Sequence, residues 1–396
     1  MKRFCGFIAG FVFFIAGIFK LLDPVGAGLV MKEYMDFLHL GFVSALAKPS
    51  AVALAFVEVL IGTALVTGIW RRLTAVAALI FQTFFTFLTL LLVILNPQMD
   101  CGCFGEVVHL THIQTFIKNL VLEALLVAFA FPFRYLGGPK KHKYVSFGVV
   151  MLSVLAFSLY TWLYIPFVDY TAFKPAVALQ AGSAFATVED DSYEAVFVYE
   201  KDGKTEEFSL DELPDSTWTF VDVRTTPGSE QVANTVSLSF YDELGAYQDS
   251  LAVKGKVLVV SLYDAGVRQS VWEKVASFVS MAEEVGFTSL VLVSATDEQL
   301  NNVYAKLPQQ TEILKRCLYR SDYKTLVTMN RSNGGVTYFS DGYLVKKWAA
   351  KSRPGMNELQ EVFNGDDTET IIGSDAVGSL AFQGFLLYVF AVMLLL

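Results

Sequence analysis

Cysteine is scarce in this chain of 396 residues, which has Cys5, Cys101, Cys103 and Cys317. So few cysteines exclude a small scaffold that is held together by several disulfide bonds. Basic residues are also in the minority, because 30 Lys and Arg stand against 39 Asp and Glu. The net charge of −9 argues against nucleic acid as a partner, since nonspecific binding to it requires a basic surface. Repeats and low-complexity tracts are absent as well.

Apolar residues, in contrast, are abundant. They make up 54% of the chain, and the mean hydropathy of +0.47 is too high for an ordinary soluble enzyme. A membrane core about 30 Å thick needs roughly 20 apolar residues of helix. Runs of this kind predict six transmembrane helices, near 4–22, 51–69, 73–95, 113–133, 145–167 and 377–396. The first run lacks a small-residue cleavage pattern, so we expect a retained helix and not a signal peptide.

Charge is distributed unevenly, and this predicts an orientation in the membrane. Up to Tyr170 the chain has 12 Lys and Arg against 8 Asp and Glu, whereas the remainder has 18 against 31. Basic residues occur on alternate loops, at 2–3, 70–72 and 134–143. The positive-inside rule assigns these loops to the cytoplasm. We therefore expect a bacterial inner-membrane protein with a cytoplasmic N-terminus and an acidic periplasmic domain over about 168–376.

This acidic region has the pattern of a soluble α/β domain. Alternating residues at 194–199 and 205–210 flank Asp202-Gly203, which predicts a β-hairpin. Further on, 257–263 and 289–294 have the composition of buried strands, and 271–285 between them has helical spacing. This order implies a parallel pair with a right-handed crossover. A helix over 297–306 and a closing hairpin over 334–348 complete the order of a thioredoxin-like domain.

Cys101 and Cys103, separated by Gly102, are the main candidates for chemistry. Two thiols this close can form a small strained disulfide that exchanges easily, which makes them a candidate redox pair. A permanent disulfide that tightens a loop between two helices is the structural alternative. A soft metal site is a third interpretation, and it needs further ligands such as His109 and His112.

Two other residues are candidates for the same chemistry. Glu58 lies in the middle of a predicted span, where an ionisable side chain is costly unless it is paired or protonated. It is either a proton site or a hydrogen-bonding group in helix packing, with Gln82, Lys118 and Glu123 as possible neighbours. Cys317, between basic residues of the soluble domain, is either a packed core residue or a resolving thiol for the CGC pair.

Four phrases of the membrane half stand out: Gly17–Pro24, Glu58 with Gly62, Asp100–Gly105 and Thr115–Asn119. In these phrases the chain resembles the bacterial DoxX-like and MauE-like families of four-helix membrane proteins. For MauE the resemblance implies help with disulfide formation in an exported partner. The chain also resembles a bacterial group in which such a bundle is fused to an exported thioredoxin-like domain.

The soluble region resembles a TlpA-like thioredoxin domain that has lost its working residues. Active members carry Cys-x-x-Cys where the first buried strand meets its helix, but 263–269 contains no cysteine. The family's cis-proline is also absent from 333–337. These departures imply a degenerate domain that recognises a partner and performs no dithiol chemistry.

The fold class predicted from these patterns is a membrane α-helical bundle with an α/β thioredoxin-like soluble domain. Residues 1–135 form the DoxX/MauE-like four-helix bundle, and 136–170 form a cytoplasmic basic loop and a fifth transmembrane helix. A linker and β-hairpin subdomain spans 171–250, and the degenerate thioredoxin-like domain spans 251–365. A C-terminal transmembrane helix over 376–396 ends the chain.

Two functions follow from this fold. In the first, Cys101 and Cys103 exchange with thiols of an exported client or a periplasmic oxidoreductase, which the soluble domain docks. In the second, the protein is a non-catalytic scaffold with a structural CGC disulfide. The sequence leaves open whether the protein is an enzyme and predicts no cofactor. A quinone or another lipid-soluble molecule between the helices, with Glu58 as its proton site, is a further alternative.

Overall fold

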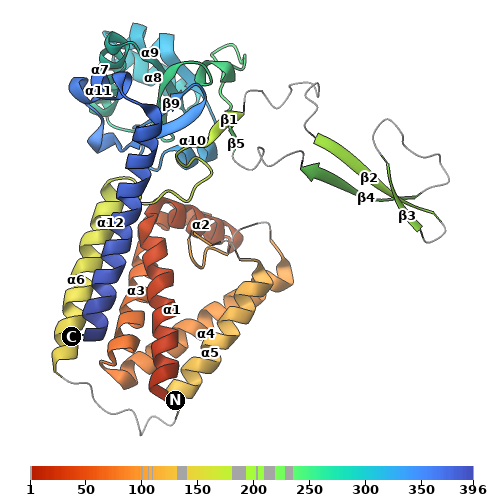
Figure 1. The fold of residues 1–396 in the computed structure, drawn as a ribbon, viewed down its shortest axis with the longest axis vertical. Coiled ribbons are helices and arrows are strands. Elements are labelled where there is room, and N and C mark those ends of the chain that lie inside the picture. Colours follow the sequence, from red (N-terminus) through yellow and green to blue (C-terminus); the bar gives the residue numbers. More distant parts are fainter. Residues whose placement is uncertain are drawn as a thin grey trace. The chain divides into compact units, whose positions relative to one another are not determined.

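The computed structural model describes residues 2–97, 99, 101–105, 107–108, 110–131, 141–180, 193–201, 204–208, 219–227 and 235–395. The chain divides into two compact units. The first comprises Met1–Lys174, Val327–Thr337 and Lys346–Leu396, and the second comprises Pro175–Leu326 and Tyr338–Val345. The long helices belong to the first unit (Figure 1).

The six predicted apolar spans are confirmed as helices. They are α1 (Lys2–Leu22), α3 (Ala47–Thr67), α4 (Arg71–Leu95), α5 (His112–Ala130), α6 (His142–Leu163) and α12 (Asp367–Leu395). Each is long and apolar enough to cross a membrane. Helix α12 begins at Asp367, ahead of its apolar run, because acidic residues in a first turn stabilise the N-terminus of a helix.

Helices α1 and α3 approach each other closely because glycines lie where they meet. A Cβ atom at Gly62 would lie 2.5 Å from the Phe14 nitrogen, and one at Gly17 would lie 2.6 Å from Val59 Cγ2. Small residues let membrane helices pack backbone to backbone. Helices α4 and α5 form a second closely packed pair, and the two pairs diverge toward the end of the bundle where α2 lies (Figure 1).

The short helix α2 (Pro24–Phe37) directly follows α1. Asp23 forms its N-cap and accepts a hydrogen bond from the Gly26 nitrogen at 2.9 Å, while Pro24 occupies the first helical position. The other carboxylate oxygen of Asp23 lies 2.8 Å from Nε of Arg331, which belongs to the same unit. A 3₁₀ helix, η1 (Gly41–Leu46), then connects α2 to α3. The connection between α1 and α3 is therefore made of two helical segments.

The chain after α6 contains a mixed seven-stranded sheet of order β5-β1-β10-β9-β6-β7-β8. Its strands are β1 (Ala178–Gln180), β5 (Thr235–Ser237), β6 (Lys256–Leu262), β7 (Thr288–Val293), β8 (Leu318–Arg320), β9 (Gly335–Ser340) and β10 (Tyr343–Trp348). Strands β6 and β7 are parallel, and α7 (Gln269–Val285) connects them, as predicted. The closing hairpin is confirmed as β9 and β10.

Shorter helices accompany this sheet: α8 (Asp297–Lys306), α9 (Thr311–Cys317), α10 (Tyr323–Met329) and α11 (Met356–Asn364), with the 3₁₀ turns η5 (Asp249–Ala252) and η6 (Ala350–Ser352). The predicted helix over 297–306 is α8. In the second unit the sheet is covered by α7, whose Trp272 is 1% exposed, and the inner strand β6 is buried along nearly its whole length. Burial on both faces is the reason why β6 and β7 are continuous apolar runs.

A separate three-stranded antiparallel sheet has the order β3-β2-β4. Its strands are β2 (Tyr193–Lys201), β3 (Lys204–Phe208) and β4 (Thr219–Pro227). Strands β2 and β3 confirm the predicted hairpin, although its turn, Asp202-Gly203, lies outside the described residues.

Candidate functional site

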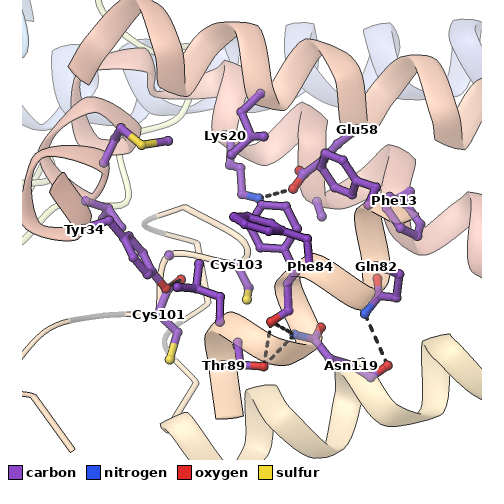
Figure 2. A pocket seen from close by; sticks show the side chains of 18 of the residues that line it. Phe13, Lys20, Tyr34, Glu58, Gln82, Phe84, Thr89, Cys101, Cys103 and Asn119 are labelled. Atoms are coloured by element: carbon purple, nitrogen blue, oxygen red, sulfur yellow. Dashed lines mark hydrogen bonds and ion pairs between the residues drawn. The ribbon is translucent and has the colours of Figure 1, made fainter. Parts of the chain in front are cut away.

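A cavity of about 280 Å³ lies inside the membrane bundle. It is bounded by α1, α2, α3, α4, α5 and the loop after α4, and most of its wall is apolar (Figure 2). The polar side chains that reach it include Lys20, Tyr34, Glu58, Gln82, Cys101 and Cys103. The structure thus brings Glu58 and both cysteines of the CGC loop to one cavity.

Glu58 is paired with a lysine from the neighbouring helix. Nζ of Lys20 on α1 lies 2.5 Å from Oε1 of Glu58 on α3, and both side chains are almost fully buried. Burying two charges is costly unless they compensate each other, which is the reason why they meet here. The other oxygen, Glu58 Oε2, is buried and has no hydrogen-bond partner among the described residues. Glu58 therefore has one oxygen fixed by an ammonium group and one oxygen available.

The neighbours that we expected for Glu58 make other contacts instead. Nε2 of Gln82 donates to the Asn119 carbonyl at 3.2 Å. The Lys118 ammonium lies 5.0 Å from the centre of the Phe104 ring. Glu123 accepts a hydrogen bond from Thr83 Oγ1 at 2.7 Å. Sequence reasoning missed Lys20, although a second ionisable residue in an apolar helix was a signal that the two would pair.

The CGC loop is held against α2. The Tyr34 hydroxyl donates to the Cys101 carbonyl at 3.0 Å. Gly102 has φ +58°, in the left-handed region, and a Cβ there would lie 2.4 Å from Cγ1 of Val30. Burial raises the pKa of the Tyr34 phenol, and negative charge on Cys103 and Cys101 acts in the same direction. Tyr34 therefore remains a protonated donor to the loop.

His112 lies directly beside one of the two sulfurs. Its Nδ1 is 2.9 Å from Sγ of Cys101, and its Nε2 is 3.0 Å from the Pro97 carbonyl oxygen. A carbonyl only accepts, so Nε2 carries a proton and Nδ1 faces the sulfur. The imidazole can then take the thiol proton or, when fully protonated, stabilise the thiolate. Cys101 is buried, whereas Cys103 is partly exposed.

A helix cap positions this histidine. Thr111 is the N-cap of α5 and forms a capping box with Gln114, which makes His112 the first residue of the helix. The sequence offers His112 as a possible metal ligand but does not reveal its contact with Cys101. The Thr-x-x-Gln pattern was a signal that a helix starts here, but it could not show how the loop folds back.

The remaining candidates have different surroundings. Cys317 ends α9 in the second unit and is buried, and burial together with Glu283 raises the pKa of its thiol to about 12. This disfavours Cys317 as a resolving thiol, since the thiolate is the reactive form. His109 lies outside the described residues. Within the described part of the chain, no three His, Cys, Asp or Glu residues are grouped so that they could hold a metal ion.

These features define a membrane helical bundle with a thiol pair at an internal cavity. Residues 2–132 match the family of methylamine utilisation protein MauE, so this part is a MauE-like membrane domain and the chain is a membrane protein. The resemblance to MauE is thereby confirmed, whereas those to DoxX and to thioredoxin-like domains stay predictions. Residues 193–227, which include β2, β3 and β4, match a domain of unknown function, DUF8463.

One curated relative is Protein TlpB of Flavobacterium psychrophilum, which is 24% identical over 155 residues. The match covers 38% of this chain and 42% of TlpB, so it spans less than half of that relative's length. No solved structure matches the chain.

Proposed function

We propose that this protein is an inner-membrane thiol–disulfide exchange factor whose Cys101–Cys103 pair oxidises thiols of an exported client. The observation that carries the proposal is the 2.9 Å contact between Cys101 Sγ and His112 Nδ1, next to the partly exposed Cys103. A thiol needs such a basic partner to react as thiolate near neutral pH. The MauE match supports the proposal, because the resemblance to MauE implies help with disulfide formation.

The two cysteines have different roles in this proposal. A client thiolate attacks the more exposed sulfur, Cys103, and breaks its bond to Cys101. Cys101 leaves as a thiolate, which the His112 imidazolium stabilises, and a more stable leaving thiolate departs faster. The second client thiolate then attacks the client sulfur bound to Cys103 and releases Cys103 as a thiolate, which takes up a proton that the client thiols have lost. The client gains a disulfide and loses two electrons, and the CGC pair gains both.

The orientation and the soluble region belong to the same proposal. The basic loops predict that the CGC loop faces the periplasm, where disulfides form. The junction of β6 and α7, over 263–269, has no cysteine, and the soluble thiol Cys317 has a raised pKa. We assign this degenerate thioredoxin-like domain to client docking, in which a sheet edge or groove binds extended chain.

The test is exchange between the full-length protein in lipid nanodiscs, with its CGC pair oxidised, and a reduced peptide that contains two cysteines. Maleimide trapping followed by mass spectrometry gives the state of each cysteine. We expect Cys101→Ser and Cys103→Ser to abolish exchange, and the matched variants Cys5→Ser and Cys317→Ser to leave it intact. His112→Ala should slow exchange by about a hundredfold, in the range for loss of a proton-transfer group.

The scaffold alternative makes the opposite prediction. If the oxidised wild-type pair does not exchange with the peptide, and both CGC variants lose only thermal stability, the pair is structural and the exchange proposal is wrong. External labelling with a membrane-impermeant maleimide checks the orientation separately. Labelling of reduced Cys103 only after the membrane is opened would contradict a periplasmic site.

A further inference from the structure

We infer that the bundle cavity binds the ring of a lipid-soluble quinone, which re-oxidises the CGC pair. This inference rests on the proposed function, since each oxidised client leaves Cys101 and Cys103 as two thiols. To work again, the pair must pass two electrons and two protons to an acceptor. A quinone is the class of membrane-borne molecule that takes up both together, because it becomes a quinol.

The size and walls of the cavity fit such a ring. A dry cavity of about 150 Å³ is large enough to hold benzene. The cavity here has about 280 Å³, which leaves room for a six-membered ring with substituents. Its walls include Phe13, Phe81 and Leu122, and apolar and aromatic walls are typical of sites for small organic ligands.

Two side chains of the cavity wall are also exposed on the outside of the bundle. Phe84 lines it and is 58% exposed, and its position midway along α4 places that exposed surface at the level of the membrane core. Leu38, at the end of α2, lines it too and is 42% exposed. In this inference the ligand enters between these exposed side chains from the bilayer and leaves its apolar tail there. This favours a membrane-borne acceptor over one dissolved in water.

Two charged side chains line the cavity and can interact with an oxygen of the quinone ring. Lys20 and Glu58 line the cavity on one side, and the CGC loop lines it on another (Figure 2). The Lys20 ammonium can donate a hydrogen bond to a quinone oxygen and stabilise negative charge that develops there. Glu58 Oε2 is buried in the same region without a hydrogen-bond partner among the described residues, so it can carry a proton.

The atoms and electrons balance in this step. The two S–H bonds of Cys101 and Cys103 are broken and one S–S bond forms, which releases two electrons and two protons. The quinone takes up both electrons, and its two oxygens become the two hydroxyls of the quinol. His112 receives the proton of Cys101 and the Glu58 carboxylate receives that of Cys103. These two groups supply the protons of the two quinol hydroxyls, and Glu58 protonates the ring oxygen nearest to it. The thiols are oxidised and the quinone is reduced.

The test uses the full-length protein in nanodiscs and decylubiquinone as the probe, without oxygen. We expect reduced wild-type protein to form one CGC disulfide for each quinol produced, read by maleimide trapping and by the ultraviolet absorbance of the quinone. An azido derivative of the same quinone should label cavity peptides in the Cys101→Ser/Cys103→Ser double variant, which binds without chemistry.

Two pairs of variants separate the cavity from the rest of the bundle. Ala51 lines the cavity on α3 and Ala53 is exposed on the same helix, so Ala51→Phe should reduce quinone reduction by about tenfold or more while Ala53→Phe does not. Glu58→Gln should slow the reaction by about a hundredfold. Glu123→Gln, on α5 and outside the cavity lining, is its control. Retained exchange between oxidised pair and client peptide shows that each variant is folded.

The outcomes distinguish the two proposals. If client exchange proceeds but decylubiquinone neither labels the cavity nor oxidises the pair, the quinone inference is wrong and the proposed function stands. Labelling or oxidation that Ala51→Phe leaves unchanged also overturns the inference, because the quinone then acts from outside the cavity. If the quinone labels the cavity and oxidises the pair but no client exchange occurs, the inference stands and the proposed function fails.

Discussion

The MauE-like bundle and the second unit bury their residues in different ways. The second unit fills its interior with large side chains, such as Trp272, Phe240 and Tyr338, which are at most 1% exposed. The bundle also buries large side chains, such as Phe14, but it leaves a cavity of about 280 Å³ that a buried ion pair and two thiols line. Close packing stabilises a fold, whereas reaction requires space and polar groups. This difference in packing fits our proposal that thiol chemistry belongs to the bundle and client docking to the second unit.

The largest expected difference between the two regions is in thiol reactivity. Burial raises the pKa of Cys317 to about 12 from a usual value of 9.0, which lowers its thiolate fraction by about a thousandfold. We expect maleimide to modify reduced Cys103 quickly and Cys317 only after unfolding, as measured by time-resolved mass spectrometry. Because the folded state retains the Cys317 proton, its contribution to stability is present below pH 9.0 and is lost as the pH rises toward about 12. Equal labelling rates for Cys103 and Cys317 in the folded protein would contradict the expected difference in thiol reactivity.

A core substitution tests whether the two regions depend on each other. Trp272→Ala removes a fully buried ring from α7 and should lower the free energy of unfolding by about 3–5 kcal/mol. Near-ultraviolet circular dichroism and limited proteolysis follow the loss of the soluble fold. In the same samples, the rate of Cys103 labelling should not change. A parallel change in that rate would show that the bundle depends on the packing of the second unit.

The ion pair of the bundle should respond to loss of one partner. Lys20→Met leaves the Glu58 carboxylate buried without its ammonium, which should cost about 3 kcal/mol. Reversible unfolding in mixed micelles measures this change. The double variant Lys20→Met/Glu58→Gln removes both charges and should recover most of the stability. If the double variant is no more stable than the single one, the two residues do not act as a pair.

Each region has a helix that begins with the same capping box, and this gives the smallest predicted effect. Thr111 and Gln114 cap α5, while Thr296 and Gln299 cap α8. Replacing either threonine by alanine should cost about 1 kcal/mol. Only Thr111→Ala should also slow exchange with the client peptide, because the cap holds His112 beside Cys101. An equal effect of Thr296→Ala on exchange would break this distinction.

Much of the fold could be predicted from periodicity alone. The six apolar runs and the β6-α7-β7 pattern are local signals, because each lies within one stretch of sequence. Segments of that length and spacing have few stable structures other than a membrane helix or a buried strand-helix-strand unit. The site was predictable only in part. Glu58 and the CGC loop were visible as unusual residues in their surroundings. The contact of Glu58 with Lys20 and that of Cys101 with His112 join separate segments, so they depend on the packing of helices and on the path of a loop.

Gly102, between the two cysteines of the CGC loop, cannot easily be replaced by another residue. Val30 of α2 occupies the place where any other residue would have its Cβ, and the left-handed backbone at this position is itself unfavourable for such a residue. A substitution would therefore push the loop off the helix beneath it and carry both cysteines with it. Because residue 102 has no side chain, the loop can lie against α2, and both thiols stay at the cavity.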